Sequence, residues 1–175
     1  MVPIMIDIRW CHDAARARAL ASLFSDNLKS TYISHSELQG FRALAPGRWA
    51  PDISQVLKQE LLARVGSAED PAANGLSMLA AGISDGADDV GVMLVTFSRA
   101  AAVPYCVLED IVVRTALRDK GYGRQALDWL DGECRRRAIG RVFLESGIDN
   151  KRAHEFFERD GFKPISVVMM KSIDP

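Results

Sequence analysis

Apolar and polar residues alternate with different periods along this chain, and each period predicts a different element. Residues 4–10 alternate isoleucine with other side chains, which is the period of a half-buried strand. Residues 13–28 and 51–66 carry apolar side chains at three- and four-residue spacing, which predicts two amphipathic helices. Asp13 is placed to cap the first helix. The buried stripe predicted for that helix consists of Ala15, Ala19, Leu20, Leu23, Phe24 and Asn27.

The rest of the chain predicts loops first and then strands and helices. Residues 29–50 predict a short helix and loops, and residues 67–75 predict a surface loop. The elements predicted after that loop are strands over 76–83, 90–98 and 105–113, a helix that ends at Gly140, a strand over 141–146, a helix that Gly161 ends, and a last strand or hairpin arm over 162–173.

This order of elements predicts the fold class. Consecutive strands joined by short connections pair antiparallel, and a strand–helix–strand unit needs a right-handed crossover. We therefore expect an α/β fold with a mixed, mainly antiparallel sheet and helices on both faces. A length of 175 residues suits one hydrophobic core, so we expect a single domain over residues 1–175.

Charge and composition exclude several classes of protein. The net charge of −1 argues against a protein that coats nucleic acid or binds an anionic membrane surface. Cys11, Cys106 and Cys134 fit neither a disulfide framework nor a metal-ligand spacing, so we expect no bound metal. No apolar run approaches the ~18 residues of a membrane span, and the N-terminus lacks a secretory pattern, so we expect a cytoplasmic protein.

The turn that follows residues 105–113 is a candidate anion site. Gly121 and Gly123 lie where a helix begins, and the first N–H groups of a helix have no partner within it. Glycine lets a ligand approach those N–H groups closely, and the helix dipole is positive there, so phosphate is the expected occupant. The cations around this turn are Arg114, Arg118, Lys120 and Arg124.

One interpretation of this turn is a dinucleotide-binding fold. Gly121, Gly123 and Ala126 match the pattern G-x-G-x-x-A, and Glu145 lies near the end of the next strand, where that fold holds ribose. In that fold, however, the first glycine directly ends the strand, whereas here the charged residues 114–120 intervene. Too few residues follow Glu145 for the further parallel strands that the fold requires. We therefore do not favour this interpretation.

A second interpretation accounts for more residues. Residues 118–123, RDKGYG, resemble the R/Q-x-x-G-x-G/A pyrophosphate loop of the GCN5-related N-acetyltransferase (GNAT) family. The resemblance covers about residues 90–170, and LED at residues 108–110 looks like the spermidine/spermine-type subgroup. A later group is similar to the family motif N-x-x-A-x-x-F-Y-x-x-x-G-F, and it consists of Asn150, Ala153, Phe156, Phe157, Gly161 and Phe162.

The resemblance implies an acyl-CoA N-acyltransferase fold and an acetyl-transfer reaction. An acetyl group would pass from acetyl-CoA to a primary amine of a small molecule or peptide, by direct attack of the amine on the thioester. The pyrophosphate would bind backbone N–H groups of residues 118–124, and the pantetheine would pair like an extra strand with residues 111–113. The cofactor-binding residues implied are Ile111, Val112, Val113, Arg118, Asp119, Lys120, Gly121, Tyr122, Gly123, Arg124, Asn150 and Phe157.

The resemblance also implies a catalytic base. Glu109 is the first candidate, acting through a water, because an ammonium must lose a proton before it can attack. Glu145 is the second candidate. If the strand is regular, Glu109 and Asp110 point to opposite faces, so at most one of them serves a given cleft.

Two positions depart from the family pattern. Phe157 stands where the family often has a tyrosine that protonates the departing sulfur, so Tyr122, Tyr105 and solvent stay open as proton sources. Asp119 stands where the family commonly has glycine, and we expect it to act as a helix N-cap. Because of Phe157, a non-catalytic acyl-CoA-binding or sensing module is the alternative function. The amine acceptor stays open, and so does homodimerisation, which is common in such folds.

Overall fold

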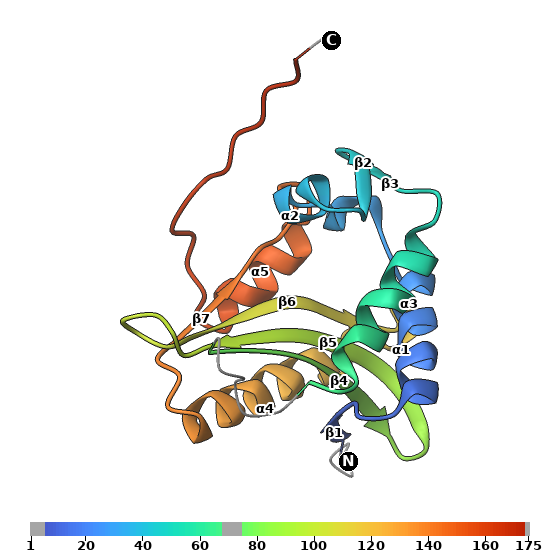
Figure 1. The fold of residues 1–175 in the computed structure, drawn as a ribbon, viewed down its shortest axis with the longest axis vertical. Coiled ribbons are helices and arrows are strands. Elements are labelled where there is room, and N and C mark those ends of the chain that lie inside the picture. Colours follow the sequence, from blue (N-terminus) through green and yellow to red (C-terminus); the bar gives the residue numbers. More distant parts are fainter. Residues whose placement is uncertain (1–5, 68–74, 174–175) are drawn as a thin grey trace.

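A five-stranded sheet organises the computed structural model, which describes residues 6–67 and 75–173 (Figure 1). The strand order is β1-β4-β5-β6-β7, in which β6 and β7 are parallel and the other neighbours antiparallel. The mixed, mainly antiparallel α/β fold is therefore confirmed. The strands of this sheet are β1 (Ile6–Trp10), β4 (Leu76–Asp85), β5 (Asp88–Ser98), β6 (Tyr105–Val113) and β7 (Arg141–Leu144).

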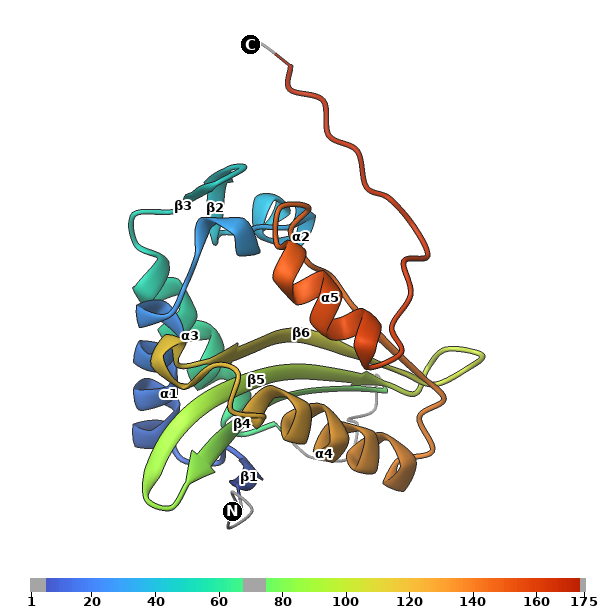
Figure 2. The same cartoon turned by 180° about the vertical axis from the view of Figure 1, so that it is seen from behind.

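Helices cover both faces of the sheet, as Figures 1 and 2 show from opposite sides. The apolar side chains of α1 and α3 pack together on one face, and those of α4 pack on the other face. None of the described helices has the length and apolarity that a membrane-spanning segment requires. The helices are α1 (Ala14–Asp26), α2 (His35–Gln39), α3 (Ile53–Arg64), α4 (Tyr122–Arg136) and α5 (Lys151–Arg159), with short 3₁₀ turns at Ser30–Tyr32 and Thr115–Leu117.

Two helix ends follow the caps that the sequence predicts. Asp13 caps α1, since its carboxylate accepts a hydrogen bond of 2.7 Å from the N–H of Arg16. Gly161 follows α5 with φ +97°, a left-handed conformation that glycine adopts at little cost. The next N–H, that of Phe162, donates back to the carbonyl of Phe157 over 3.0 Å. Both ends are local hydrogen-bond arrangements, so short sequence patterns predict them well.

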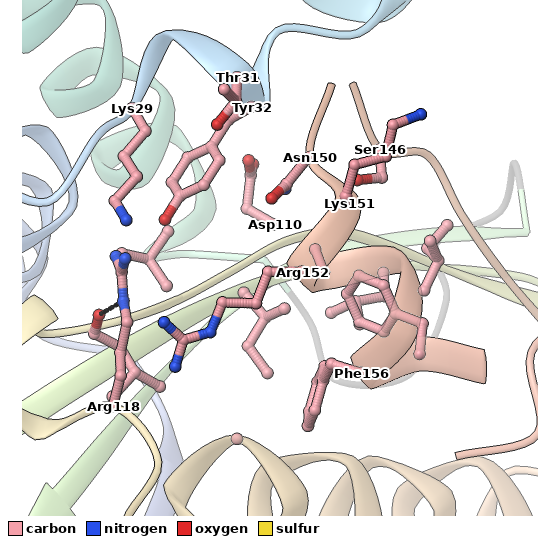
Figure 3. Close-up of a pocket in the computed structure, with 18 of the residues that line it drawn as sticks. Lys29, Thr31, Tyr32, Asp110, Arg118, Ser146, Asn150, Lys151, Arg152 and Phe156 are labelled. Atoms are coloured by element: carbon pink, nitrogen blue, oxygen red, sulfur yellow. Dashed lines mark hydrogen bonds between the residues drawn. The ribbon is translucent and has the colours of Figure 1, made fainter. Parts of the chain in front are cut away.

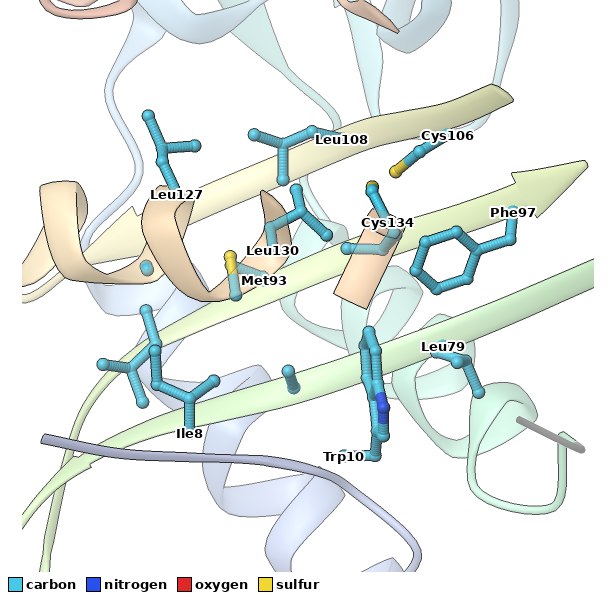
Figure 4. Close-up of a cluster of buried hydrophobic side chains, with 14 of the residues drawn as sticks. Ile8, Trp10, Leu79, Met93, Phe97, Cys106, Leu108, Leu127, Leu130 and Cys134 are labelled. Carbon is cyan, nitrogen blue, oxygen red and sulfur yellow. The ribbon is translucent and has the colours of Figure 1, made fainter. Parts of the chain in front are cut away.

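The core between α4 and the sheet is closely packed (Figure 4). Trp10 packs edge-on against Phe97 and Trp129, with ring centroids 5.9 and 4.8 Å apart. Cys106 and Cys134 are buried free thiols that belong to this core. Each fully buried large apolar side chain contributes about 1.5–3 kcal/mol of transfer free energy. This core therefore holds β6 and α4, and the turn between them, in a fixed relation.

The predicted buried stripe of α1 is partly wrong. Ala15 and Ala19 are exposed, whereas Ala17 and Ala21 are buried beside Leu20 and the other large side chains of the helix. Alanine spacing alone does not distinguish two adjacent faces of a helix. The large side chains decide between them, because α1 packs them against α3 and β5.

The end of the chain also differs from the prediction. Residues 163–173 form no strand, and they extend away from the body of the protein with every side chain exposed (Figures 1 and 2). Two further strands within the predicted loop region, β2 (Ala43–Ala45) and β3 (Arg48–Trp49), form a small hairpin that the sequence did not reveal. Most of the predicted loop at residues 67–75 lies outside the described residues.

Candidate functional site

A cleft opens where β6 and β7 stop pairing. Their ladder ends at Leu108 and Leu144, but β6 continues to Val113 without β7 beside it. A cavity of about 600 Å³ lies along this part of β6, and Ile111, Val112 and Val113 all line it. The strand therefore offers an edge to which an extended ligand can bind by main-chain hydrogen bonds.

The glycine-containing turn closes one end of this cavity, and we call residues 114–124 the phosphate turn. Gly121 adopts φ +87° directly before α4, and no side chain among the described residues caps the helix there. The first N–H groups of α4 are therefore not occupied by a capping side chain. A β-carbon at Gly123 would lie 3.2 Å from the ring of Phe156, so α5 packs closely on the start of α4. The turn can accept an anion on its backbone.

The prediction that Asp119 caps the helix is wrong. Gly121 occupies the N-cap position, and Asp119 lies two residues earlier with φ +64°. The carboxylate of Asp119 instead accepts hydrogen bonds from the guanidinium of Arg152, which lowers the pKa of that carboxyl. Arg152 of α5 projects into the cavity in Figure 3. An arginine that the sequence motifs did not include thus neutralises the acidic residue of the phosphate turn.

Arg118 is held in place by the body of the protein. Its guanidinium donates to the carbonyls of Val113 and Asn27 over 3.3 and 3.4 Å. The ring of Tyr32 lies beside it, with the guanidinium carbon 6.0 Å from the ring centroid (Figure 3). Burial raises the pKa of Tyr32. Tyr32 and Lys29 line the same cavity but come from the segment between α1 and α2, where the sequence showed no motif.

A β-bulge in β6 changes the orientation of the two acidic residues. Leu94 pairs with Asp110 and Val95 pairs with Leu108, so Glu109 is an extra residue without a partner on β5. Glu109 also accepts a hydrogen bond from Thr96, which lies on the same face as Leu94. The expectation that the two acids point to opposite faces is therefore wrong, because the bulge breaks the alternation.

Each of these two acids is bound to an arginine whose side chain is little exposed, 11% for Arg42 and 5% for Arg64. The guanidinium of Arg64 donates to Glu109 over 2.5 Å. The guanidinium of Arg42 donates to both carboxylate oxygens of Asp110 over 3.0 and 2.9 Å, and also to Glu60. Burial nevertheless raises the pKa of Asp110 to about 6. A carboxyl with such a pKa exchanges protons near neutral pH, as a general base must.

A second cavity, of about 520 Å³, adjoins this pair of acids. It is lined by five carboxylates and two arginines, Arg42 and Arg64, so negative charge is in excess. Within residues 6–67 and 75–173, no three His, Cys, Asp or Glu side chains are arranged to hold a metal ion. We call this the carboxylate end of the cleft, and its acidic residues are Glu37, Glu60, Glu109, Asp110 and Glu145.

The remaining predicted residues lie in or near the cleft. Asn150 lines the cavity at the start of α5 (Figure 3), and Phe157 lines it while also packing in the core. Glu145 lies within 3.1 Å of the imidazole of His35. The hydroxyl of Tyr122 donates a hydrogen bond of 2.6 Å to Asp85 at the end of β4. This hydroxyl is therefore already engaged in a hydrogen bond within the protein.

Tyr105 lies at the other end of β6, outside the residues that line the cavity, where its ring packs against Phe143. Neither Tyr105 nor the engaged hydroxyl of Tyr122 therefore faces the cleft as a ready proton donor.

Comparison with known proteins gives a family match that covers the phosphate turn, β6 and α5. The profile of the acetyltransferase (GNAT) family matches residues 58–162 of this chain. An uncharacterized N-acetyltransferase of Bacillus subtilis (strain 168), YhdJ, is 34% identical over 67 residues, which are 38% of this chain and 47% of that protein. The match thus spans about half the length of this relative.

Solved structures share the fold across nearly the whole chain. A putative acetyltransferase (YycN) from Bacillus subtilis is 20% identical with a TM-score of 0.64, over 97% of this chain and 100% of that one. An aminoglycoside acetyltransferase from an uncultured soil metagenomic sample, in complex with sisomicin, is 15% identical with a TM-score of 0.61, over 97% of each chain. At such identities, the likeness concerns the fold alone.

Proposed function

This chain belongs to the GNAT family of acetyltransferases, and we propose that it transfers the acetyl group of acetyl-CoA to a primary amine. One observation carries the proposal. The unpaired edge of β6 leads directly to the uncapped start of α4 within a single cavity. An extended chain that ends in a phosphate group fits both features at once.

In the proposed complex, acetyl-CoA binds along this line. Its pyrophosphate accepts hydrogen bonds from the backbone of the phosphate turn, with Arg118 and Lys120 nearby. Its pantetheine pairs with residues 111–113, and its thioester lies toward the carboxylate end. Asn150 and Phe157 contact the pantetheine from α5, which is consistent with their position in the cavity wall.

The proposed reaction is direct attack of the neutral amine on the thioester carbonyl. The amine nitrogen forms the new bond to carbon and loses its surplus proton to solvent, the carbon–sulfur bond breaks, and CoA leaves as a thiolate. A backbone N–H near Val112 or Val113 polarises the carbonyl oxygen. Glu109 accepts the proton of the ammonium through a water. Asp110 is the alternative base, and its raised pKa supports that role.

The leaving sulfur has little help from nearby side chains. Phe157 has no proton to give, and the hydroxyl of Tyr122 is bound to Asp85. A thiol has a reference pKa near 8.5, so a thiolate is a tolerable leaving group that solvent then protonates. We therefore expect turnover without a dedicated acid.

We propose a cationic acceptor for the carboxylate end. Five carboxylates and two arginines line that cavity, so a molecule with more than one ammonium group would meet favourable charge. Polyamines and aminoglycosides have this chemistry, and a structural neighbour of this chain is an aminoglycoside acetyltransferase. A neutral or acidic amine would lack these contacts.

A second candidate function is an acyl-CoA-binding module without turnover. Phe157 and the engaged hydroxyl of Tyr122 favour it, because neither can protonate the sulfur. The module would bind acetyl-CoA in the same cavity, so binding alone does not distinguish the two functions.

Calorimetric titration and thiol release together test the proposal. We expect acetyl-CoA and CoA to bind while NADH does not, and we expect thiol release from acetyl-CoA when spermidine or an aminoglycoside is added. Binding without release for any polyamine, aminoglycoside or peptide amine would favour the binding module. Binding of NADH in place of both CoA species would contradict the donor site itself.

A further inference from the structure

One buried hydroxyl in the wall of the first cavity lacks a hydrogen-bond partner. Within the part of the chain that the structure describes, the Oγ of Ser146 is buried but makes no hydrogen bond. Ser146 also lines the cavity in which we place acetyl-CoA (Figure 3). An unpaired buried hydroxyl lowers stability, so a folded protein that keeps one needs a reason to do so. A partner that arrives with the ligand fits the position of this residue.

Ser146 lies beside the junction of the two cavities. Ser146 directly follows Glu145 and is part of the lining of the first cavity, whereas the lining of the second ends at Glu145. The amine and the thioester must meet at the junction, so Ser146 is on the donor side, where the sulfur of the thioester belongs. The residues that line both cavities are Glu37, Leu108, Glu109, Asp110 and Glu145.

The chain on both sides fixes the backbone of Ser146. Leu144 ends the ladder between β7 and β6 two residues earlier. Gly147 packs on the segment between α1 and α2, because a β-carbon there would lie 2.6 Å from the carbonyl oxygen of Ile33. The carbonyl of Gly147 accepts a hydrogen bond of 2.9 Å from the N–H of Asn150. With the backbone held, rotation about one side-chain torsion is enough to turn the hydroxyl toward a ligand in the cavity.

The leaving sulfur is the atom of the ligand that needs such a donor. Negative charge develops on it as the carbon–sulfur bond breaks. Phe157 carries no hydroxyl, and the hydroxyl of Tyr122 is bound to Asp85. A hydrogen bond donated to a charged group is stronger than one between neutral groups, and it stabilises the charged form. The unpaired hydroxyl and the developing thiolate therefore complement each other.

We propose that Ser146 is a catalytic residue whose hydroxyl donates a hydrogen bond to the sulfur of acetyl-CoA as the carbon–sulfur bond breaks. The electron pair of that bond goes to the sulfur. The hydroxyl keeps its proton, because an alcohol is a weaker acid than a thiol, and solvent protonates the thiolate afterwards. This inference rests on the acetyl transfer proposed above.

Bound CoA tests the hydrogen bond without any need for turnover. A hydrogen bond to the charged form lowers a pKa. The pKa of the CoA thiol should therefore be lower by about one unit or more on the wild-type chain than on Ser146→Ala. Ultraviolet absorbance of the thiolate in a pH titration measures it, with each protein titrated without CoA in parallel. The carboxylates of Glu37, Glu109, Asp110 and Glu145 are common to both proteins, so their effect cancels in the comparison.

Steady-state rates and melting separate a catalytic role from a structural one. Ser146→Ala should lower kcat by about 10–100-fold and keep KM for acetyl-CoA within about twofold, because the bond strengthens only as the sulfur gains charge. It should melt at the wild-type temperature or up to about 4 °C higher, since alanine removes an unpaired buried hydroxyl. Ser22→Ala on the exposed side of α1 is the matched control and should keep the wild-type rates.

The possible outcomes distinguish this inference from the proposed function. Equal pKa values of the CoA thiol on the two proteins would overturn the role of Ser146, even if the wild-type chain acetylates amines. A Ser146→Ala variant that loses melting temperature together with activity would also overturn it. A lowered thiol pKa on a wild-type chain that acetylates no amine would overturn the proposed function but support the contact between Ser146 and the sulfur. Absence of CoA binding would overturn both.

Discussion

The two ends of the cleft are built in different ways. The phosphate turn is one continuous stretch of chain, and no capping side chain occupies the first N–H groups of α4 beside it. The carboxylate end gathers charged groups from α2, the β2 region, α3 and β6, and its arginines are already bound to carboxylates. The first region therefore has backbone N–H groups available for binding, whereas much of the charge in the second region also holds the fold together.

The largest effect should come from removing the base. Glu109→Gln should lower turnover by about 10²–10⁴-fold with little change in acetyl-CoA affinity, because a positioned base contributes that much. Steady-state rates with calorimetric affinity provide the measurement, and Glu155→Gln on the exposed side of α5 is the matched control. Should Asp110→Asn lose activity while Glu109→Gln keeps it, the base is Asp110.

An arginine with little exposed surface should matter more for folding than an exposed arginine. Arg42→Met would leave Asp110, Glu60 and Glu37 without their shared cation, which should cost about 3–5 kcal/mol of unfolding free energy. Arg124→Met is the control, because its side chain is 60% exposed against 11% for Arg42, and it should cost only about 0–1 kcal/mol. Urea denaturation measures both, and equal losses would contradict the contrast between the two ends.

The phosphate turn should affect binding rather than folding. Arg118→Ala should raise the Kd for acetyl-CoA by about 10–100-fold, the range expected for one charged hydrogen bond. Its control is Arg135→Ala, at the exposed end of α4 and outside the cavity. Calorimetry with acetyl-CoA measures the change. A wild-type Kd in Arg118→Ala would place the pyrophosphate elsewhere.

A further effect should be a pH dependence of stability. The pKa of Asp110 is raised to about 6 in the folded protein, so the folded state holds that proton more tightly than the unfolded state. Its contribution to stability is therefore present at low pH and is lost as pH rises from about 4 to about 6, by about 1.4 kcal/mol per unit of pKa difference.

Asp110→Asn cannot titrate, so its stability should change less over that interval. Urea denaturation between pH 4.5 and 7 compares the two proteins. Identical pH profiles would show that burial does not raise this pKa, and the case for Asp110 as a base would then fail.

The sequence by itself determined the features that depend on neighbouring residues. The strand at Tyr105–Val113, the glycine turn before α4 and the caps at Asp13 and Gly161 all agree with the structure. Each of them rests on hydrogen bonds or backbone conformations within a few residues. A local pattern therefore contains the physical cause of the local structure.

Only the tertiary structure decided which charged groups form the carboxylate end and which path residues 163–173 take. Arg42 donates hydrogen bonds to Asp110, which lies 68 positions later in the sequence. Arg64 donates to Glu109, which lies 45 positions later. The raised pKa of Asp110 depends on burial that those distant segments create, and the bulge at Glu109 depends on the register with β5. Residues 163–173 have the composition of a strand, but they form no strand because they pair with no edge of the sheet. Burial and pairing are properties of the assembled molecule, so no stretch of sequence contains them alone.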